Sequence, residues 1–230
     1  GVSLSELCAL GPEGLLNNTS NAQPAILTAS LAALKLTKHY RSEIFKANPK
    51  YFLGHSVGEY SALAAAGIID QRTAIYLVRQ RGLLMETASQ LWPGKMVALH
   101  GFESEEQVVN LCMKAGVEIA NSNGPGQLTI TGGEKEVNEV VRMAKEWKLK
   151  PRELTISGGF HSSKMKPIQQ PFREILARAE FKDLNPQTIF VLNATGLPAS
   201  SVEEIKEELV MQLIAPVRWW KSIEFVLDQG

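Results

Sequence analysis

A serine between two glycines, in the segment Gly54-His55-Ser56-Val57-Gly58, follows a short apolar run and precedes an alanine-rich stretch. In the G-x-S-x-G pattern the serine lies on a sharp turn from a strand into a helix, and the small flanking residues let the two elements approach closely. Such a turn places the serine Oγ at a helix N-terminus, where backbone N–H groups can stabilise an oxyanion. The pattern therefore predicts a nucleophilic Ser56 on an α/β scaffold; the alternative is an ordinary glycine-bracketed bend.

Helices with a periodic apolar face alternate with short apolar strands on both sides of this turn. Glycine, asparagine and proline separate these elements, as is typical of loops between helices and strands. Pro24 falls near the predicted start of the first long helix, where its missing N–H costs little. The predicted helices cover residues 23–39, 59–67, 72–90, 165–179 and 202–212, and the predicted strands cover residues 51–54 and 188–194.

The pattern changes after Pro93-Gly94. Residues 95–157 contain shorter elements in the order strand, helix, strand, strand, helix, strand. This is the order of a ferredoxin-like module. We therefore expect a small ferredoxin-like subdomain at residues 95–157, inserted into a larger domain that is formed by residues 1–94 and 158–230.

A nucleophilic serine needs a base that removes its proton, and the chain contains four histidines. His161 lies in the glycine-rich loop "SGGFHSSKMKP", which can present an imidazole to Ser56 although the two are far apart in sequence. The alternative is that His161 only caps the following helix. His55 is next to Ser56 on a sharp turn and is expected to point away from it. His39 and His100 are expected to be solvated or capping residues.

Arg81 interrupts the apolar face of the helix predicted over residues 72–90. A guanidinium on such a face either finds an anion or extends to water. Its planar fork suits the carboxylate of a substrate, and an internal carboxylate partner is the alternative. Four amides near predicted element ends either line a polar pocket or act as caps and turn residues. They are Gln23, Asn121, Asn123 and Gln212.

Composition and spacing argue against several classes of partner. The 24 basic side chains balance the 24 acidic ones, so no overall field favours nucleic acid or an anionic membrane. No apolar run approaches the length of a membrane span, and the N-terminus lacks the layout of a signal peptide. No cluster has the spacing of metal ligands, and residues 121–127 lack the spacing of a nucleotide-binding loop. Cys8 and Cys112 are expected to be free thiols in a reducing compartment.

Five ordered motifs resemble those of the malonyl-CoA:acyl carrier protein transacylase family. They are "GHSVGEYSALAAAG", "RQRGLLM", "NSNGPGQLTITG", "GGFHSSKMKP" and "MQLIAPVRW", and the resemblance spans the chain from "NAQPAIL" to "WWKSIEFVLDQG". It implies an α/β-hydrolase-like large subdomain with the ferredoxin-like small subdomain inserted, and an active site between them. It also implies transfer of malonyl from malonyl-CoA to the phosphopantetheine thiol of acyl carrier protein in fatty acid biosynthesis, with no metal or redox cofactor.

Position by position, the resemblance implies that Ser56 is acylated and that His161 is its base. The backbone carbonyl of Gln212 would orient His161, in the place of an aspartate. Arg81 would pair with the malonyl carboxylate, and the Val57 N–H would be an oxyanion donor. The other pocket-lining residues that the resemblance implies are His55, Gln23, Asn121, Asn123 and Phe160, which resembles the residue of malonyl-selecting members.

The family pattern begins with a strand and a G-Q-G-x-Q loop that supplies a second oxyanion donor, and it continues past "VLDQG". This sequence contains neither part, so we expect it to be trimmed at both ends. A basic patch that includes Lys164 and Lys166 is expected to receive the acidic carrier protein. The chain is expected to be a monomer, cytoplasmic in a bacterium, or mitochondrial or plastidial in a eukaryote. The alternatives are a serine hydrolase or thioesterase with the same turn, and a catalytically weakened binding or scaffold homologue.

Overall fold

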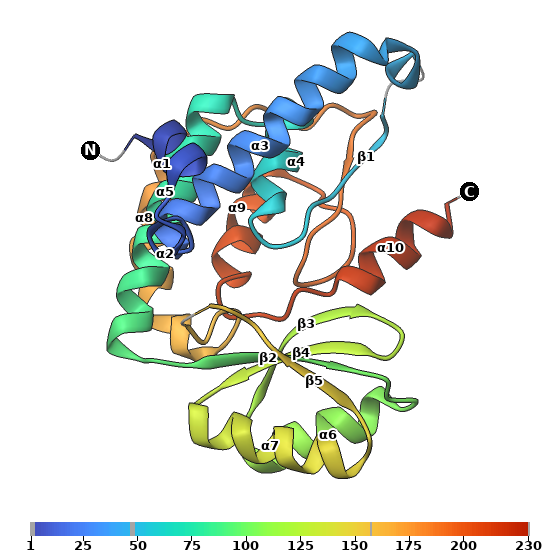
Figure 1. Ribbon diagram of the computed structural model, residues 1–230. Coiled ribbons are helices and arrows are strands. Elements are labelled where there is room, and N and C mark those ends of the chain that lie inside the picture. The colour runs from blue at the N-terminus through green and yellow to red at the C-terminus, as the bar shows by residue number, and fades with distance from the viewer. Residues whose placement is uncertain (1–2, 47–48, 157, 230) are drawn as a thin grey trace.

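The computed structural model describes residues 3–46, 49–156 and 158–229, which form an α/β structure with a four-stranded sheet and a two-stranded sheet. The four-stranded sheet lies at one end of the molecule, and most of the remaining helices surround the smaller sheet at the other end (Figure 1). Outside residues 95–153 the helices are α1 (Leu4–Leu10), α2 (Glu13–Leu16), α3 (Thr19–Tyr40), η1 (Ser42–Phe45), α4 (Gly58–Ala65), α5 (Gln71–Leu91), η2 (Ser163–Ile168), α8 (Gln169–Ala177), α9 (Val202–Met211) and α10 (Trp219–Leu227).

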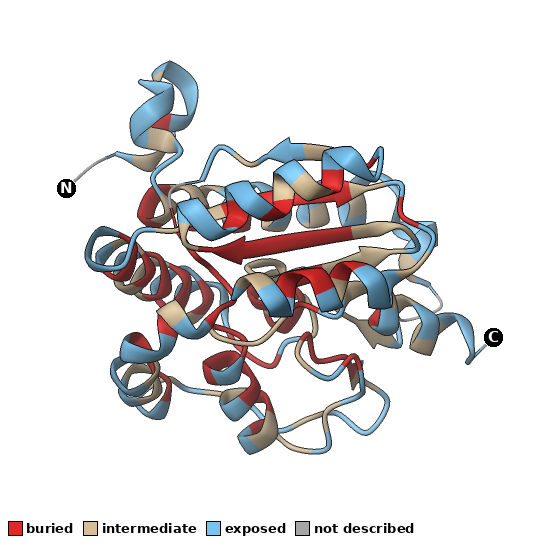
Figure 2. Ribbon diagram, turned by 90° about the horizontal axis from the view of Figure 1, so that it is seen from below, coloured by how far each residue is buried: buried red, intermediate tan, exposed pale blue. Residues whose placement is uncertain are grey.

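The four-stranded sheet has the strand order β3-β4-β2-β5, and all neighbouring strands are antiparallel. Two helices cover one face of this sheet (Figure 1), and the residues between helices and sheet form a hydrophobic cluster of their own. Seen from the side of these helices, the inner residues are buried and the outer helix faces are exposed (Figure 2). In chain order the elements are β2 (Lys95–His100), α6 (Glu105–Ala115), β3 (Glu118–Gly124), β4 (Gln127–Gly132), α7 (Glu134–Glu146) and β5 (Lys150–Glu153).

The last strand of this region is shorter than predicted. It ends at Glu153, where the pairing with β2 ends, whereas the sequence pattern predicts a strand to residue 157. Residue 157 itself lies outside the described residues. The order strand, helix, strand, strand, helix, strand is nevertheless the observed order of the elements.

The smaller sheet pairs β1 (Tyr51–Phe52) with β6 (Ile189–Phe190) in parallel. Both strands are shorter than the predicted ranges 51–54 and 188–194. A ladder lasts only as long as both strands run side by side, and the chain leaves β1 for the turn at Gly54. The last bond of this ladder runs from the Val191 N–H to the Phe52 carbonyl, at 2.9 Å.

The helix predicted over residues 165–179 is interrupted. The structure has a 3₁₀ segment, η2, followed by the α-helix α8. Pro167 explains the difference, because it lacks an N–H for an α-helical bond and disfavours the α conformation of the residue before it. Among the described residues, four helical elements were not predicted, namely α1, α2, the 3₁₀ segment η1 and α10.

Pro24 lies inside α3 and not in its first turn, because the helix begins at Thr19 and not near Gln23. A proline at this position cannot donate to the carbonyl of Ser20, one turn earlier. The Arg79 guanidinium, on α5, donates to that carbonyl at 2.5 Å and to the Asn21 Oδ1 at 2.8 Å. A side chain of the neighbouring helix therefore replaces the missing backbone hydrogen bond.

Helices α3 and α5 approach each other closely at Gly82. A Cβ at this position would lie 2.8 Å from both the Ser20 Cα and the Thr19 carbonyl oxygen, which are backbone atoms that cannot move independently. Gly82 therefore lets α5 pack directly against the first turn of α3, and this contact brings Arg81 next to Gln23.

Replacing Gly82 with alanine is expected to lower the free energy of unfolding by about 1–3 kcal/mol, because the new methyl group forces the two backbones apart. Denaturant titration followed by circular dichroism measures this change. Gly14→Ala is the matched control, because a Cβ at Gly14 meets no atom within 4 Å. Equal stability of the two variants would show that the helix contact is not tight.

Candidate active site

Ser56 lies on the turn between β1 and α4 and has a φ of 53°, in the left-handed region that residues with a side chain rarely adopt. The turn is tight, because a Cβ at Gly54 would lie 2.1 Å from the Gly58 carbonyl oxygen. The first glycine of the G-x-S-x-G pattern is therefore required for steric reasons. The conformation presents the Ser56 side chain ahead of the N-terminus of α4.

His161 reaches Ser56 from the loop that follows β5. Its Nε2 lies 2.8 Å from the Ser56 Oγ, and its Nδ1 lies 2.8 Å from the backbone carbonyl oxygen of Gln212. A carbonyl can only accept, so the Nδ1 carries the proton and the Nε2 is free to accept one from the Ser56 hydroxyl. Like Ser56, His161 has a positive φ, of 55°.

Burial, together with the nearby Arg81 charge, lowers the pKa of His161 to about 3. The imidazole is therefore neutral at physiological pH and available as a proton acceptor. The three residues predicted from sequence as nucleophile, base and orienting carbonyl are thus joined by two hydrogen bonds, and the side chain of His161 does not cap the following helix.

Arg81 is buried on α5 and faces the same serine. Its Nη2 lies 3.1 Å from the Ser56 Oγ and 2.7 Å from the Gln212 Oε1, and its Nη1 donates to the Gln23 Oε1 at 2.7 Å. Within the described parts of the chain it forms no ion pair with a carboxylate, and its buried Nε has no hydrogen-bond partner. Neither extension to water nor an internal carboxylate is observed. A buried cation whose hydrogen-bond partners among the described residues are amide and hydroxyl groups is suited to a carboxylated ligand.

The side chain of Gln212 connects Arg81 to a buried acid. Its Nε2 donates to the Glu59 Oε2 and, at 3.2 Å, to the Ser56 carbonyl, which leaves its Oε1 to accept from Arg81. Burial and the neighbouring Glu208 raise the pKa of Glu59 well above its usual value. Glu59 is not among the residues predicted from the sequence, although a charged residue on an otherwise apolar helix is the same kind of signal that Arg81 gives.

The other predicted pocket residues divide into separate groups. The His55 Nε2 lies 2.9 Å from the Asn123 Oδ1, and its ring lies beside that of Trp219, with the centroids 5.7 Å apart. Burial lowers the pKa of His55. Asn121 lies opposite Val217 in a parallel bridge whose hydrogen bonds are made by Ala120 and Ser122. Nothing in the described chain hydrogen-bonds the buried Oδ1 of Asn121.

Phe160 directly precedes His161 in the sequence, and Val57 directly follows Ser56. Phe160 is buried and lines a cavity of about 280 Å³ together with the start of α3 and the end of α5. The Val57 N–H donates to no acceptor among the described residues, whereas the Ser56 N–H donates to the Asn193 Oδ1. The turn thus offers one backbone donor that an oxyanion can use.

The model of the acyl transferase domain family matches residues 1–222. The chain belongs to this family. It is 39% identical to the malonyl CoA-acyl carrier protein transacylase of Bacillus subtilis (strain 168), over 99% of the chain and 71% of that relative. It is 36% identical to the enzyme of the same name from Staphylococcus aureus (strain COL), over 95% of the chain and 70% of that relative.

Solved structures are similar to this acyl transferase domain in fold and in sequence. The malonyl-CoA:acyl carrier protein transacylase (FabD), Xoo0880, of Xanthomonas oryzae pv. oryzae KACC10331 has a TM-score of 0.91 and 33% identity, over 100% of the chain and 73% of that protein. A malonyl-transacylase in complex with a type II PKS acyl-carrier protein, PlMCAT:AntF, has a TM-score of 0.89 and 36% identity, over 99% of the chain and 73% of that protein.

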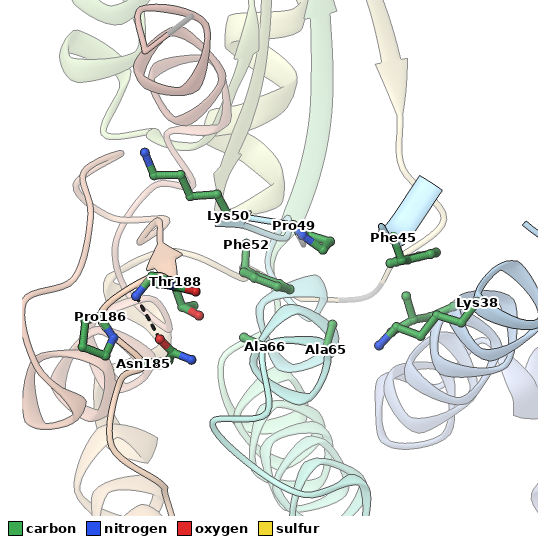
Figure 3. Close-up of a pocket in the computed structure, with 12 residues that line it drawn as sticks. Lys38, Phe45, Pro49, Lys50, Phe52, Ala65, Ala66, Asn185, Pro186 and Thr188 are labelled. Carbon is green, nitrogen blue, oxygen red and sulfur yellow. Dashed lines mark hydrogen bonds between the residues drawn. The ribbon is translucent and has the colours of Figure 1, made fainter. Parts of the chain in front are cut away.

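Figure 3 shows a second cavity of the acyl transferase, of about 680 Å³. Ser56, His161, Arg81 and Gln212 are not among the residues that line it. It is lined by Lys38 and Phe45 from the end of α3 and from η1, by Lys50 before β1, and by Ala66 after α4. Ser56 follows the carboxyl end of β1, whereas this cavity lies around the amino end of β1. Ligands of parallel α/β sheets bind beyond the carboxyl ends of the strands, so this cavity is not the acyl site.

In the described part of the acyl transferase no three histidine, cysteine or carboxylate side chains are grouped as metal ligands. Among the described helices, none has the length and apolar character needed to cross a membrane.

Proposed function

We propose that this acyl transferase moves malonyl from malonyl-CoA to the phosphopantetheine thiol of acyl carrier protein, in fatty acid synthesis, through a malonyl ester on Ser56. One observation carries the proposal. A neutral imidazole and a buried guanidinium converge on the same serine oxygen, His161 at 2.8 Å and Arg81 at 3.1 Å. The imidazole suits proton removal, and the guanidinium suits an acyl group that ends in a carboxylate.

In the first half of the reaction the Ser56 Oγ attacks the thioester carbonyl while His161 takes the hydroxyl proton. The Val57 N–H stabilises the oxyanion, Arg81 pairs with the malonyl carboxylate, and His161 returns the proton to the departing coenzyme A thiol. In the second half His161 takes the proton of the carrier thiol, whose sulfur attacks the ester, and the Ser56 oxygen leaves and regains its proton. Thioester exchange transfers no electrons, so we propose that no metal or redox cofactor takes part.

The proposal includes two subdomains, a ferredoxin-like one at residues 95–157 and an α/β-hydrolase-like one formed by residues 1–94 and 158–230. Two separate hydrophobic clusters and the strand order β3-β4-β2-β5 support this division. For the carrier protein we propose a docking surface that includes Lys164 and the exposed Lys166, which follow His161 closely in sequence. Because the relatives named above are bacterial, we propose that the chain acts in bacterial cytoplasm. A monomeric state is part of the same proposal.

Mixing the protein with malonyl-CoA is expected to add one malonyl group to the peptide that carries Ser56, as measured by intact mass and peptide mapping. Adding holo-acyl carrier protein is expected to move that group to the carrier. Rapid loss of malonyl-CoA without carrier protein would instead indicate a hydrolase or thioesterase. A protein that is never acylated would support a binding or scaffold role and end the proposal.

A further inference from the structure

Asn193 has no part in the steps above, yet its side chain spans the nucleophile turn. It lies shortly after β6 and is fully buried. Its Nδ2 donates to the Gly54 carbonyl at 2.7 Å, and its Oδ1 accepts from the Ser56 N–H at 2.7 Å. One carboxamide therefore binds the backbone on both sides of His55.

Asn193 is itself held firmly from two directions. Its N–H donates to the Glu59 Oε1 at 2.8 Å, and its carbonyl accepts from the Arg218 N–H at 2.8 Å. The next residue, Ala194, donates its N–H to the Glu208 Oε1 at 2.6 Å. The backbone that carries the carboxamide is thus fixed in place, and the two hydrogen bonds to Gly54 and Ser56 fix the rotamer of the side chain.

The Ser56 conformation needs such external support. A non-glycine residue in the left-handed region costs about 1–2 kcal/mol, and it persists only where the surrounding structure fixes it. The two hydrogen bonds from Asn193 act on the backbone groups that set the orientation of this residue. They also occupy the Ser56 N–H, so that the neighbouring Val57 N–H is the donor left for an oxyanion.

We propose that Asn193 is a positioning residue, whose carboxamide holds the Ser56 turn so that the Oγ points at His161. This inference rests on the proposed acylation of Ser56. Binding both the Gly54 carbonyl and the Ser56 N–H requires one donor and one acceptor on the same short side chain, which asparagine provides. An ionised aspartate has the shape but lacks the donor, and it would place a negative oxygen against the Gly54 carbonyl.

The test is therefore Asn193→Asp, measured as the rate of Ser56 malonylation at about pH 8 and about pH 5.5. The titratable and charged groups around the backbone of Asn193 and Ala194 are Glu59, Glu208 and Arg218, whose Nε donates to the Ala194 carbonyl at 2.9 Å. Arg81 and His161 contact Ser56 at its Oγ. Asn193 is fully buried, and burial disfavours the ionised form of a carboxyl, so the pKa of the introduced carboxyl is expected to be raised. Once protonated, it again offers a donor to Gly54 and an acceptor to Ser56.

At about pH 8 we expect the malonylation rate of Asn193→Asp to be roughly 10- to 100-fold lower than that of the wild type, with a similar KM for malonyl-CoA, because the reacting oxygen is misplaced. At about pH 5.5 we expect most of this loss to disappear. The wild-type base stays neutral there, because the pKa of His161 is about 3. Asn138→Asp, which adds the same charge at an exposed position on α7, is the matched control and is expected to behave as the wild type.

A malonylation rate within twofold of the wild type at about pH 8, or an equal loss at both pH values, would overturn the inference. If Asn193→Asp unfolds at about pH 8, Asn193→Ala decides, because it removes both hydrogen bonds without adding a charge. It is expected to be slower by a similar factor at both pH values, and an unchanged rate would again overturn the inference. Failure of the wild type to be malonylated would count against the proposed function instead.

Discussion

Replacing His161 with alanine is expected to lower the rate of Ser56 acylation by about 10²–10⁴-fold, the usual contribution of a positioned general base. The Ser56 hydroxyl is a poor nucleophile with its proton attached, and the His161 Nε2, at 2.8 Å, is the acceptor placed to remove it. Rapid-quench mixing with malonyl-CoA, followed by intact mass measurement, gives the rate.

His100→Ala is the matched control for this experiment. His100 ends β2 in the four-stranded sheet, and it makes no side-chain hydrogen bond within the described residues. Its replacement is expected to leave the acylation rate unchanged. If both variants keep the wild-type rate, His161 is not the base and another group must activate Ser56.

Replacing Arg81 with alanine is expected to remove the preference for malonyl over acetyl. Losing one partner of a buried, hydrogen-bonded charge pair costs about 2–5 kcal/mol, which corresponds to a loss of roughly 30- to 4,000-fold in the relative rates of the two thioesters. Acetyl loading is expected to persist, because the Arg81 charge lowers the pKa of His161 and its removal makes the imidazole a stronger base. Competition between malonyl-CoA and acetyl-CoA, read by intact mass, measures the preference.

Arg142→Ala serves as the control for loss of a guanidinium. Arg142 is exposed on α7 and pairs with Glu139 and Glu146 at the surface. Its replacement is expected to leave the preference unchanged. An Arg81→Ala protein that still prefers malonyl would show that another residue recognises the carboxylate, and Gln23 would be the first candidate.

The sequence predicted the parts of the site that depend on local pattern. The G-x-S-x-G spacing identified the turn at Ser56, and the glycine-rich loop and the interrupted apolar face identified His161 and Arg81. The resemblance to a known family added Gln212, whose backbone carbonyl has no recognisable side-chain signal. The structure brings these four residues into direct hydrogen-bonded contact.

Contacts that arise only when distant segments meet could not be predicted in this way. Asn193 follows a short strand and resembles any polar residue at a strand end, and only the pairing of β6 with β1 places it against Gly54 and Ser56. The short strand lengths have the same origin, because a ladder depends on its neighbour and not on the apolar run alone. Short helices such as α1 and α2 carry too few turns for a periodic pattern to be distinguished.

Pro24 has a consequence for how Arg81 is aligned. Two helices packed side by side can slip past each other by a turn and still bury similar apolar surface. Pro24 leaves the Ser20 carbonyl of α3 without its backbone donor, and the Arg79 side chain of α5 donates to this carbonyl instead. Two residues further along α5, Arg81 then meets Gln23, the residue just before the proline. The missing backbone hydrogen bond at the Ser20 carbonyl thus sets the register of α3 against α5. This register in turn determines the position of the Arg81 guanidinium.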